Sequence, residues 1–342
     1  MRYKLLGRSG LRVSELALGT MTFGPDWGWG ASKEESRRIF DAYADAGGNF
    51  IDTANRYTNG TAERYVGEFI AADRSHFVVA TKYSLFTRRG DPNASGNSLK
   101  NMVQALEESL KRLAVDYVDL YYVHAWDFMT PVEEVMRGLD DLVRAGKVLY
   151  VGISDTPAWV VSQANTLADL RGWSRFVALQ IRYSLLDRAV ERDLLPMARA
   201  FDLAVTPWSV LGAGVLSGKY TAGPGKPAQA RAAQWNVGER DLAIAREVDA
   251  VAVETGHTSS QVAMSWVRQQ AGLIIPLVGA RSEAQMKENL GSLEFSLTAE
   301  QCARLESASR IDLGFPHDFL ASDEIRSLVY GGTYDEIDNH RA

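Results

Sequence analysis

The sequence predicts an α/β fold, namely a (β/α)8 TIM barrel with an N-terminal β-hairpin at the barrel bottom. Short apolar runs alternate with longer amphipathic stretches about eight times along the chain. Most of these runs are too apolar to alternate with polar residues, as expected of parallel strands covered on both faces. Their spacing of roughly 25 to 40 residues suits repeated right-handed β–α–β crossovers. An open doubly wound sheet would give the same local pattern, but eight units favour closure into a barrel.

The predicted strands are rich in β-branched and aromatic residues, and the helices between them show a helical apolar period. The strands are Leu16–Gly19, Asn49–Asp52, Val78–Thr81, Asp119–Val123, Leu149–Ile153, Val177–Ile181, Ala204–Pro207 and Ile274–Val278. The clearest helices are Lys33–Ala46, Ser98–Leu113, Val132–Ala145 and Arg240–Thr255.

Three segments stand outside the repeat. Residues 3–13 read as a hairpin around Gly7-Arg-Ser-Gly10, which could plug the bottom of the barrel. Residues 221–238 are rich in Gly, Pro and Ala without an apolar period, which predicts a cofactor lid rather than a linker. Residues 310–342 form a C-terminal tail. We find no domain boundary, so residues 1–342 are expected to form a single domain.

Composition excludes several classes of protein. A net charge of −6 argues against a nucleic-acid-binding surface, which is usually basic. No apolar run is long enough to cross a membrane, and the start of the chain has no signal-peptide pattern. A single cysteine, Cys302, excludes an intrachain disulfide and fits a reducing compartment, so we expect a cytoplasmic protein. The five histidines show no metal-ligand spacing, and the composition leaves the oligomeric state open.

Familiar nucleotide and hydrolase motifs fail to match. The nearest run to a Rossmann fingerprint, Gly212-Ala-Gly214-Val-Leu-Ser-Gly218, has its third glycine one position late. The run Gly152-Ile-Ser154-Asp-Thr156 resembles a nucleophile elbow, but threonine replaces the second glycine that permits the sharp turn. Neither a Rossmann fold nor a serine hydrolase is therefore expected.

Four side chains with complementary chemistry follow three consecutive predicted strands. Asp52 ends the second strand, Tyr57 lies in the same loop, Lys82 follows the third strand and His124 follows the fourth. Function in a parallel barrel gathers at these carboxyl ends. Each residue alone has an ordinary structural explanation, such as a helix cap or a core histidine. Their joint placement is much harder to explain by packing.

These residue types suit the reduction of a carbonyl group. Hydride addition creates an alkoxide, which needs a proton donor within hydrogen-bond reach. A tyrosine with a pKa of about 10 is a weak acid, and a nearby ammonium favours its phenolate, so Lys82 should make Tyr57 a better donor. Asp52 would keep that ammonium charged, and His124 could orient the carbonyl oxygen. We expect these four residues to be catalytic.

A set of runs, in order along the chain, resembles the aldo-keto reductase superfamily. The runs include Leu18-Gly-Thr20-Met21, Asn49-Phe-Ile-Asp-Thr-Ala-Asn-Arg-Tyr57, Asp119-Leu-Tyr-Tyr-Val-His124, Thr206-Pro-Trp208-Ser and Ile275-Pro-Leu-Val-Gly279-Ala-Arg281. The resemblance covers residues 5–308 and is closest to the bacterial, Kv-β-like and sugar-ketoreductase side of the superfamily. It implies a barrel that binds NADPH/NADP+ across its strand ends without a Rossmann fold, and it matches the four catalytic positions without substitution.

The cofactor positions are expected at the ends of the later strands. Ser154, Asp155 and Gln180 offer the donors and acceptors that a nicotinamide carboxamide needs, although the family more often has Asn where this chain has Asp155. Trp208 offers a flat face for the ring. The resemblance extends the expected cofactor-binding set to Gly19, Thr20, Met21, Asp52, Ser209, Leu211, Gly212, Gly214, Lys219 and Gly279.

A second cofactor region is expected near Arg281. Ser282 is a plausible helix N-cap with Gln285 three residues later, which predicts a capping box. A helix N-terminus beside a guanidinium suits an anion such as the adenosine 2′-phosphate. In the family, Gln285 and Asn289 face the adenine. A capped surface helix with a solvated arginine is the alternative.

The substrate is expected to be a small-molecule carbonyl compound, with no metal, nucleic acid or membrane involved. Aromatic side chains that follow the strands could wall its pocket; those chosen are Phe23, Trp27, Tyr83 and Trp126. Two other functions stay open. One is a nicotinamide-sensing regulatory subunit like the Kv-β proteins, disfavoured because no long N-terminal extension precedes the barrel, and the other is a sugar-3-ketoreductase.

Overall fold

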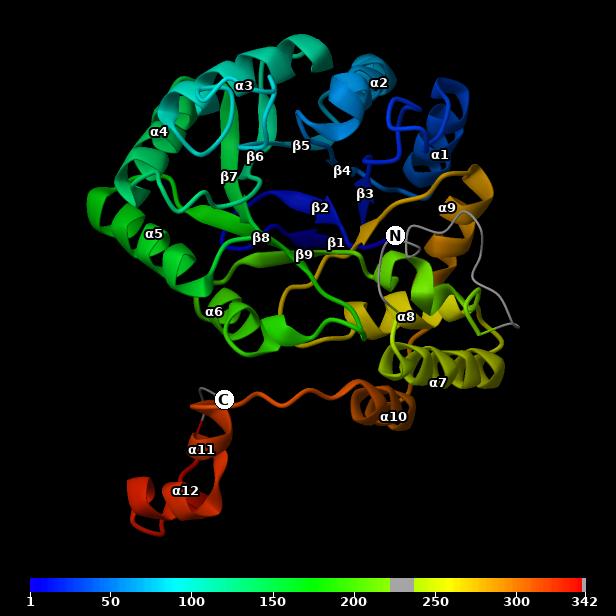
Figure 1. Ribbon diagram of the computed structural model, residues 1–342, viewed down its shortest axis with the longest axis vertical. Coiled ribbons are helices and arrows are strands. Elements are labelled where there is room, and N and C mark those ends of the chain that lie inside the picture. The colour runs from blue at the N-terminus through cyan, green and yellow to red at the C-terminus, as the bar shows by residue number, and fades with distance from the viewer. Residues whose placement is uncertain (222–236, 340–342) are drawn as a thin grey trace.

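The computed structural model describes residues 1–221 and 237–339 and confirms the predicted barrel. Eight strands pair in parallel, in the order β10-β3-β4-β5-β6-β7-β8-β9 (Figure 1). The ring closes because the Val205 N–H donates to the Leu273 carbonyl at 2.8 Å and the Ile275 N–H donates to the Val205 carbonyl at 2.8 Å. The strands are β3 (Ala17–Gly19), β4 (Phe50–Asp52), β5 (Val78–Tyr83), β6 (Val118–Val123), β7 (Val148–Ser154), β8 (Phe176–Arg182), β9 (Ala204–Trp208) and β10 (Leu277–Val278).

Helices surround this ring, and the four predicted from periodicity are present within one or two residues. Ser32 and Ser98 each begin a helix by accepting a backbone N–H with the side chain, as N-cap residues do. The helices are α1 (Lys33–Asp45), α2 (Thr61–Ile70), α3 (Leu99–Leu113), α4 (Val132–Arg144), α5 (Ala158–Arg171), α6 (Leu194–Ala200), α7 (Glu239–Thr255), α8 (Ser259–Arg268), α9 (Glu283–Leu290) and α10 (Ala299–Ser309).

The predicted hairpin closes the bottom of the barrel. Strands β1 (Tyr3–Leu5) and β2 (Arg12–Ser14) pair antiparallel, and Leu6, just after β1, and Val13, within β2, are fully buried with the inward-facing strand residues. A Cβ at Gly7 would lie 2.2 Å from the Val177 carbonyl oxygen, and φ is +56° there, so this turn requires glycine.

Strand alternation sorts the barrel interior into layers. Phe50, Ala80 and Ala178 belong to the buried inner cluster. Two residues further along each strand, on the same face, lie Asp52, Lys82 and Gln180. The apolar interior therefore ends in a polar layer at the carboxyl end of the strands, opposite the hairpin.

Two predicted segments remain to be placed. The predicted lid, 221–238, lies outside the described residues except at its two ends. The tail beyond α10 contains α11 (His317–Ala321) and α12 (Asp323–Tyr330), which lie apart from the barrel in Figure 1. None of the helices in the described part of the chain has the length and apolar character needed to span a bilayer. That residues 1–342 form a single domain stays a prediction.

Candidate active site

The four residues expected to be catalytic gather at the polar layer. Asp52 is the last residue of β4, and Lys82 lies within β5 rather than after it. Tyr57 begins a short 3-10 turn (Tyr57–Gly60) in the loop after β4. His124 follows β6, and its backbone N–H donates to the Tyr83 carbonyl at 2.9 Å, which extends the pairing of β5 with β6.

The Lys82 ammonium joins these residues. Its Nζ lies 2.5 Å from Asp52 Oδ2, 2.9 Å from the Thr53 carbonyl oxygen and 3.3 Å from Tyr57 Oη. Lys82 and Asp52 are buried, so bulk water does not screen their charges. The Tyr57 and His124 rings meet edge to face with centroids 5.8 Å apart. The structure thus brings together the four side chains singled out in the sequence.

Two supporting contacts were missed in the sequence. Gln180, expected only as a cofactor contact, donates from Nε2 to Asp52 Oδ1 at 2.8 Å, so both Asp52 oxygens are held. Tyr122 is buried in the barrel interior with its ring centroid 5.9 Å from Lys82 Nζ and its hydroxyl 3.3 Å from Thr206 Oγ1. The inward face of β6 could have indicated Tyr122, since it lies two residues before His124.

Burial and charge oppose each other at the proton-donor pair. Burial is the largest single effect and lowers the pKa of Lys82, but the charges and hydrogen bonds of Asp52 and Tyr57 together outweigh it, so the pKa of Lys82 is raised and the amine stays protonated. Burial raises the pKa of Tyr57, and the Lys82 ammonium offsets this only in part. The expected effect of Lys82 is therefore present, because its charge lowers the pKa of the phenol, although burial has the larger and opposite effect.

His124 is held in its neutral form. Burial, aided by the neighbouring Lys82 charge, keeps the pKa of His124 well below its usual range. Its Nδ1 is buried and has no hydrogen-bond partner within the described chain. A neutral imidazole can present an N–H to a carbonyl oxygen without adding charge to the site.

The far rim of the barrel carries the expected nicotinamide residues. Trp208 donates from Nε1 to Asp155 Oδ1 at 3.1 Å, and Ser154 is buried just before Asp155. Asp155 therefore holds the indole ring of Trp208 in place. Next to this rim is a cavity of about 330 Å³, lined by Arg182, Ser184, Leu186, Asp187, Ser209, Gly212, Val215, Val237 and Asp241.

The Arg281 end forms a separate, more open cavity of about 620 Å³. Its lining residues are Gly28, Trp29, Gly30, Arg281, Ser282 and Gln285. Ser282 begins α9 by accepting the Gln285 N–H at 3.3 Å. The predicted capping box is only half formed, because Gln285 Oε1 accepts the Arg281 N–H at 2.9 Å rather than that of Ser282. The Glu35 carboxylate also reaches this helix end, since its Oε1 accepts the Glu283 N–H at 2.7 Å while its Oε2 pairs with Arg38.

The remaining expected residues divide between the rim and the interior. Thr20 donates from Oγ1 to the Asp52 carbonyl at 2.9 Å, and Asn289 is buried, donating to the Gly279 carbonyl at 3.3 Å. Asn289 therefore supports the turn before Arg281. Gly19, Met21, Leu211 and Gly214 are partly exposed, and Lys219 is exposed.

The four expected substrate residues behave differently from one another. Phe23 is fully buried against Phe69, and Tyr83 is fully buried and stacked on Tyr121 with centroids 5.2 Å apart. These two rings pack in the core between strands and helices, which corrects their assignment to a pocket wall. Trp27 and Trp126 are partly exposed, as a pocket wall requires.

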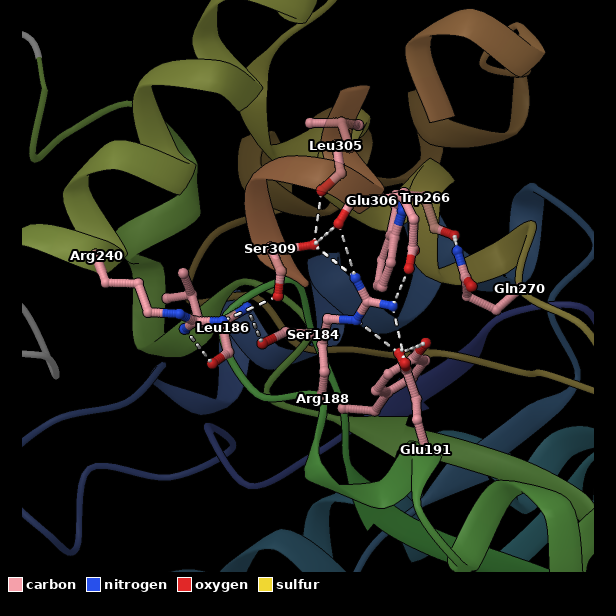
Figure 2. Close-up of polar contacts among 11 residues, drawn as sticks. Ser184, Leu186, Arg188, Glu191, Arg240, Trp266, Gln270, Leu305, Glu306 and Ser309 are labelled. Carbon is pink, nitrogen blue, oxygen red and sulfur yellow. Dashed lines mark hydrogen bonds and ion pairs between the residues drawn. The ribbon is translucent and has the colours of Figure 1, made fainter. Parts of the chain in front are cut away.

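The loop after β8 borders the 330 Å³ cavity and is held in place by the buried Arg188. Arg188 pairs with Glu191 at 2.7 Å and Glu306 at 2.5 Å, and donates to Ser309 Oγ at 2.9 Å. Arg240 bridges the Leu186 and Ser309 carbonyls. Figure 2 shows these contacts joining the loop to α10. The cavity wall is thus tied to the C-terminal part of the chain.

These features fit a nicotinamide dinucleotide. At one end, the partly exposed indole of Trp208 and the buried polar groups of Gln180 and Ser154 suit a planar ring that carries an amide. At the other end, the Arg281 guanidinium beside an open cavity suits a phosphate. The glycines of the loop after β9 favour a close backbone approach, since Gly214 has φ of +98° and no atom near its Cβ position. No cluster of three metal-ligating residues occurs in residues 1–221 and 237–339.

Comparisons with known proteins agree with this arrangement. The model of the aldo/keto reductase family matches residues 15–310. An aryl-alcohol dehydrogenase of Pestalotiopsis microspora is 39% identical, over 98% of this chain and 91% of its own length. An aryl-alcohol dehydrogenase [NADP(+)] of Phanerodontia chrysosporium is 38% identical, over 96% of this chain and 91% of its own length. A norsolorinic acid reductase of Aspergillus flavus is 37% identical, over 97% of this chain and 87% of its own length. These relatives are fungal, so the expected placement on the bacterial, Kv-β-like side is not supported.

Proposed function

Since the chain belongs to the aldo/keto reductase family and is an oxidoreductase, we propose that it reduces an aromatic aldehyde or ketone to the alcohol with NADPH. The observation that carries this proposal is the buried Asp52–Lys82 pair with Lys82 Nζ 3.3 Å from the Tyr57 hydroxyl. This arrangement holds a proton donor next to a permanent positive charge where water is largely excluded. The Lys82 charge and the Tyr57 hydroxyl can therefore stabilise the negative charge that develops on a carbonyl oxygen during its reduction.

NADPH, when bound, supplies the hydride. Tyr57 then transfers its phenolic proton to the substrate oxygen, and the charge left on the phenolate is met by the Lys82 ammonium. Asp52, held by Gln180, keeps Lys82 protonated and in place. The neutral His124 donates a hydrogen bond to the same carbonyl oxygen, which orients it toward Tyr57. The reverse sequence oxidises the alcohol with NADP+.

The residues that would hold the cofactor lie in two groups. Ser154 and Gln180 would bind the carboxamide, and Trp208, fixed by Asp155, would cover one face of the nicotinamide. Arg281 would contact the 2′-phosphate from the 620 Å³ cavity. The NADP(+) in the name of the Phanerodontia chrysosporium relative supports this choice of cofactor. The single cysteine supports a reducing compartment, so we place the enzyme in the cytoplasm.

An aromatic substrate is favoured by the names of the relatives and by the aromatic rings of the N-terminal loops. Trp27 and Trp29 pack at 5.8 Å between centroids, and the Arg56 guanidinium lies 5.7 Å from the Trp27 ring. Partly exposed indoles of this kind offer flat apolar contact area to an aryl group.

The test measures NADPH absorbance loss and alcohol formation with benzaldehyde and with an aliphatic aldehyde of similar size. We expect turnover with NADPH, higher kcat/KM for benzaldehyde, and one alcohol formed for each NADPH consumed. Absence of turnover with every carbonyl compound tested, by protein that binds NADPH, would contradict the catalytic proposal. A preference for the aliphatic aldehyde would contradict only the aromatic part.

A further inference from the structure

The segment 315–337, here called the C-terminal arm, exposes a large apolar surface. None of the described residues from 310 to 339 is buried. Of the exposed large apolar side chains in the described chain, about half lie in the arm, namely Phe315, Phe319, Leu320, Leu328, Val329, Tyr330, Tyr334 and Ile337. Together they expose on the order of 800 Å², since large side chains present roughly 150–250 Å² each. One partner of a stable protein interface buries about that area.

The arm has local order but no core of its own. Ser322 begins α12 by accepting the Ile325 N–H, and Gly331 ends it in a left-handed conformation. The Tyr330 and Tyr334 rings pack at 4.9 Å between centroids. Helices of 5 and 8 residues are too short to persist in water without tertiary packing. Another surface must therefore supply that packing.

The base of the arm is fixed to the barrel. Arg192 donates to the Asp312 carbonyl at 2.8 Å, three residues before the arm begins. Just before this point, Arg188 binds Glu306 and Ser309 of α10 in the cluster of Figure 2. From this fixed exit, α11 and α12 extend away from the barrel helices (Figure 1). The arm is directed outward, where a second molecule can reach it.

A matching surface lies on α5 of the barrel. Trp159, Gln163, Thr166 and Leu170 recur at intervals of four, three and four residues, so they share one solvent-facing stripe. Trp159 is 63% exposed and Leu170 is 80% exposed, and the stripe carries no charge. The neighbouring α4 instead exposes Glu133, Glu134, Arg137, Asp141 and Arg144, as ordinary surface helices do.

We propose that the arm of each copy docks on the α5 stripe of a second copy, so that a two-fold dimer exchanges its arms. Trp159 and Leu170 are about 16 Å apart along α5, and α12 is about 12 Å long at 1.5 Å per residue. The first turn of α12 carries Asp323 and Glu324, and the last turn of α5 carries Arg171 beside Asp169, whose charge is met by Arg175. Antiparallel docking of the two helices places these opposite charges together.

A second copy fits this surface better than other partners. It supplies an arm and a stripe in equal number, so two-fold pairing covers both apolar surfaces of both copies and leaves none to propagate. The acidic residues of α12 disfavour an anionic membrane surface. Without such docking, the apolar side chains of the arm and the two apolar ends of the stripe, Trp159 and Leu170, would face water.

The experiment is sedimentation equilibrium of the full chain, with variants that place a charge on each surface. We expect a dimer at micromolar concentration. Leu328→Glu, in the apolar stripe of α12, and Leu170→Glu, on α5, should each raise the dimer Kd at least 100-fold. Ser327→Glu, on the opposite side of α12, and Val253→Glu, at an exposed apolar position of α7, are matched controls that should remain dimeric.

Mixing the two disrupted variants tests exchange directly. A dimer of one Leu328→Glu copy and one Leu170→Glu copy keeps one wild-type arm on one wild-type α5, so the mixture should associate more tightly than either variant alone. A wild-type monomer, including one whose arm folds back on its own α5, overturns the proposal. So does a dimer that Leu328→Glu or Leu170→Glu leaves intact, or a mixture that gains no affinity. Circular dichroism and thermal unfolding of each variant verify that the barrel stays folded.

Discussion

The two ends of the proposed cofactor site differ in how completely the protein has built them. At the catalytic end, Lys82 has three partners, Asp52 has both oxygens held, and both side chains are buried. At the other end, Arg281 lies on the exposed rim of an open cavity of about 620 Å³. A carboxylate, Glu35, sits on the helix terminus where a phosphate is expected.

This difference indicates that the two ends serve different functions, one in the reaction and the other in cofactor recognition. A site that must stabilise charge during a reaction gains most from groups that are already oriented and desolvated. A site that only recognises a phosphate can remain exposed, because a guanidinium stays charged in water and forms charge-assisted contacts on binding. We therefore expect changes at the catalytic end to alter the rate, and changes at the Arg281 end to alter cofactor affinity.

The largest effect should come from Lys82→Met. It removes the charge beside Tyr57 and leaves the Asp52 carboxylate buried without its partner, so reduction should be lost. Removing one member of a buried pair typically costs about 3–5 kcal/mol of unfolding free energy. Urea unfolding and NADPH oxidation on the same samples check this. The control is Lys147→Met, which breaks an exposed pair with Glu107 and should cost about 0–1 kcal/mol. Retained activity in Lys82→Met would mean that Tyr57 needs no neighbouring cation.

Tyr57→Phe should lower turnover by a factor of about 10² to 10⁴, the usual contribution of a general acid. NADPH affinity should change little, since only the hydroxyl is removed. Fluorescence titration with NADPH and steady-state kinetics separate the two effects. Tyr65→Phe, on α2, is the matched control and should behave as wild type. A Tyr57→Phe protein with most of the wild-type activity would rule out the proton-donor assignment.

A smaller effect, confined to affinity, is expected for Arg281→Ala. Losing a charge-assisted contact costs about 1.5–3 kcal/mol, so NADPH should bind roughly 10- to 150-fold more weakly. NADH, which lacks the 2′-phosphate, should bind almost as before, and high salt should reduce the wild-type preference for NADPH. Dissociation constants for both cofactors at low and high salt test this. Equal losses for the two cofactors would show that Arg281 positions the loop instead.

The smallest effect, and in the opposite direction, is expected for Glu35→Gln. A carboxylate at the N-terminus of α9 competes with a phosphate for the same partial positive charge, an effect of about 0.3–1 kcal/mol. NADPH should bind about two- to five-fold more tightly, with NADH unchanged. Glu34→Gln is the control, because Glu34 lies in the same first turn of α1 but its carboxylate bonds to Ser32 at the start of α1, whereas that of Glu35 accepts from α9. Weaker NADPH binding in Glu35→Gln would mean that this carboxylate supports the loop that the cofactor needs.

The barrel and the grouping of Asp52, Tyr57, Lys82 and His124 at one end of it could be predicted because their signals are local in sequence. Apolar strands repeat with helices between them, and Asp52, Lys82 and His124 stand at or beside consecutive strand ends. Side-chain contacts between strands that are distant in sequence cannot be predicted from local residue patterns. The bond from Gln180 to Asp52 spans 128 residues and depends on barrel closure.

Errors in the sequence analysis came from side-chain direction and burial. Phe23 lies in the loop after β3 and Tyr83 is the last residue of β5, so both are close to the site in sequence. Their rings nevertheless pack in the layer between the strands and the helices. The pKa of Tyr57 depends on how strongly burial opposes the Lys82 charge, which the residue types alone do not reveal. Glu35 reaches α9 from a helix 248 residues earlier in the chain, so no spacing argument could include it.

We expect the buried Asp52–Lys82–Tyr57 centre to set the reaction rate and the exposed Arg281 to set cofactor affinity. The most direct test is the single-turnover rate of NADPH oxidation by benzaldehyde, measured with each enzyme saturated in NADPH. Arg281→Ala should then react at nearly the wild-type rate, and Tyr57→Phe should be slower by a factor of about 10² to 10⁴. A saturated Arg281→Ala enzyme as slow as Tyr57→Phe, or a Tyr57→Phe enzyme as fast as wild type, would contradict the account.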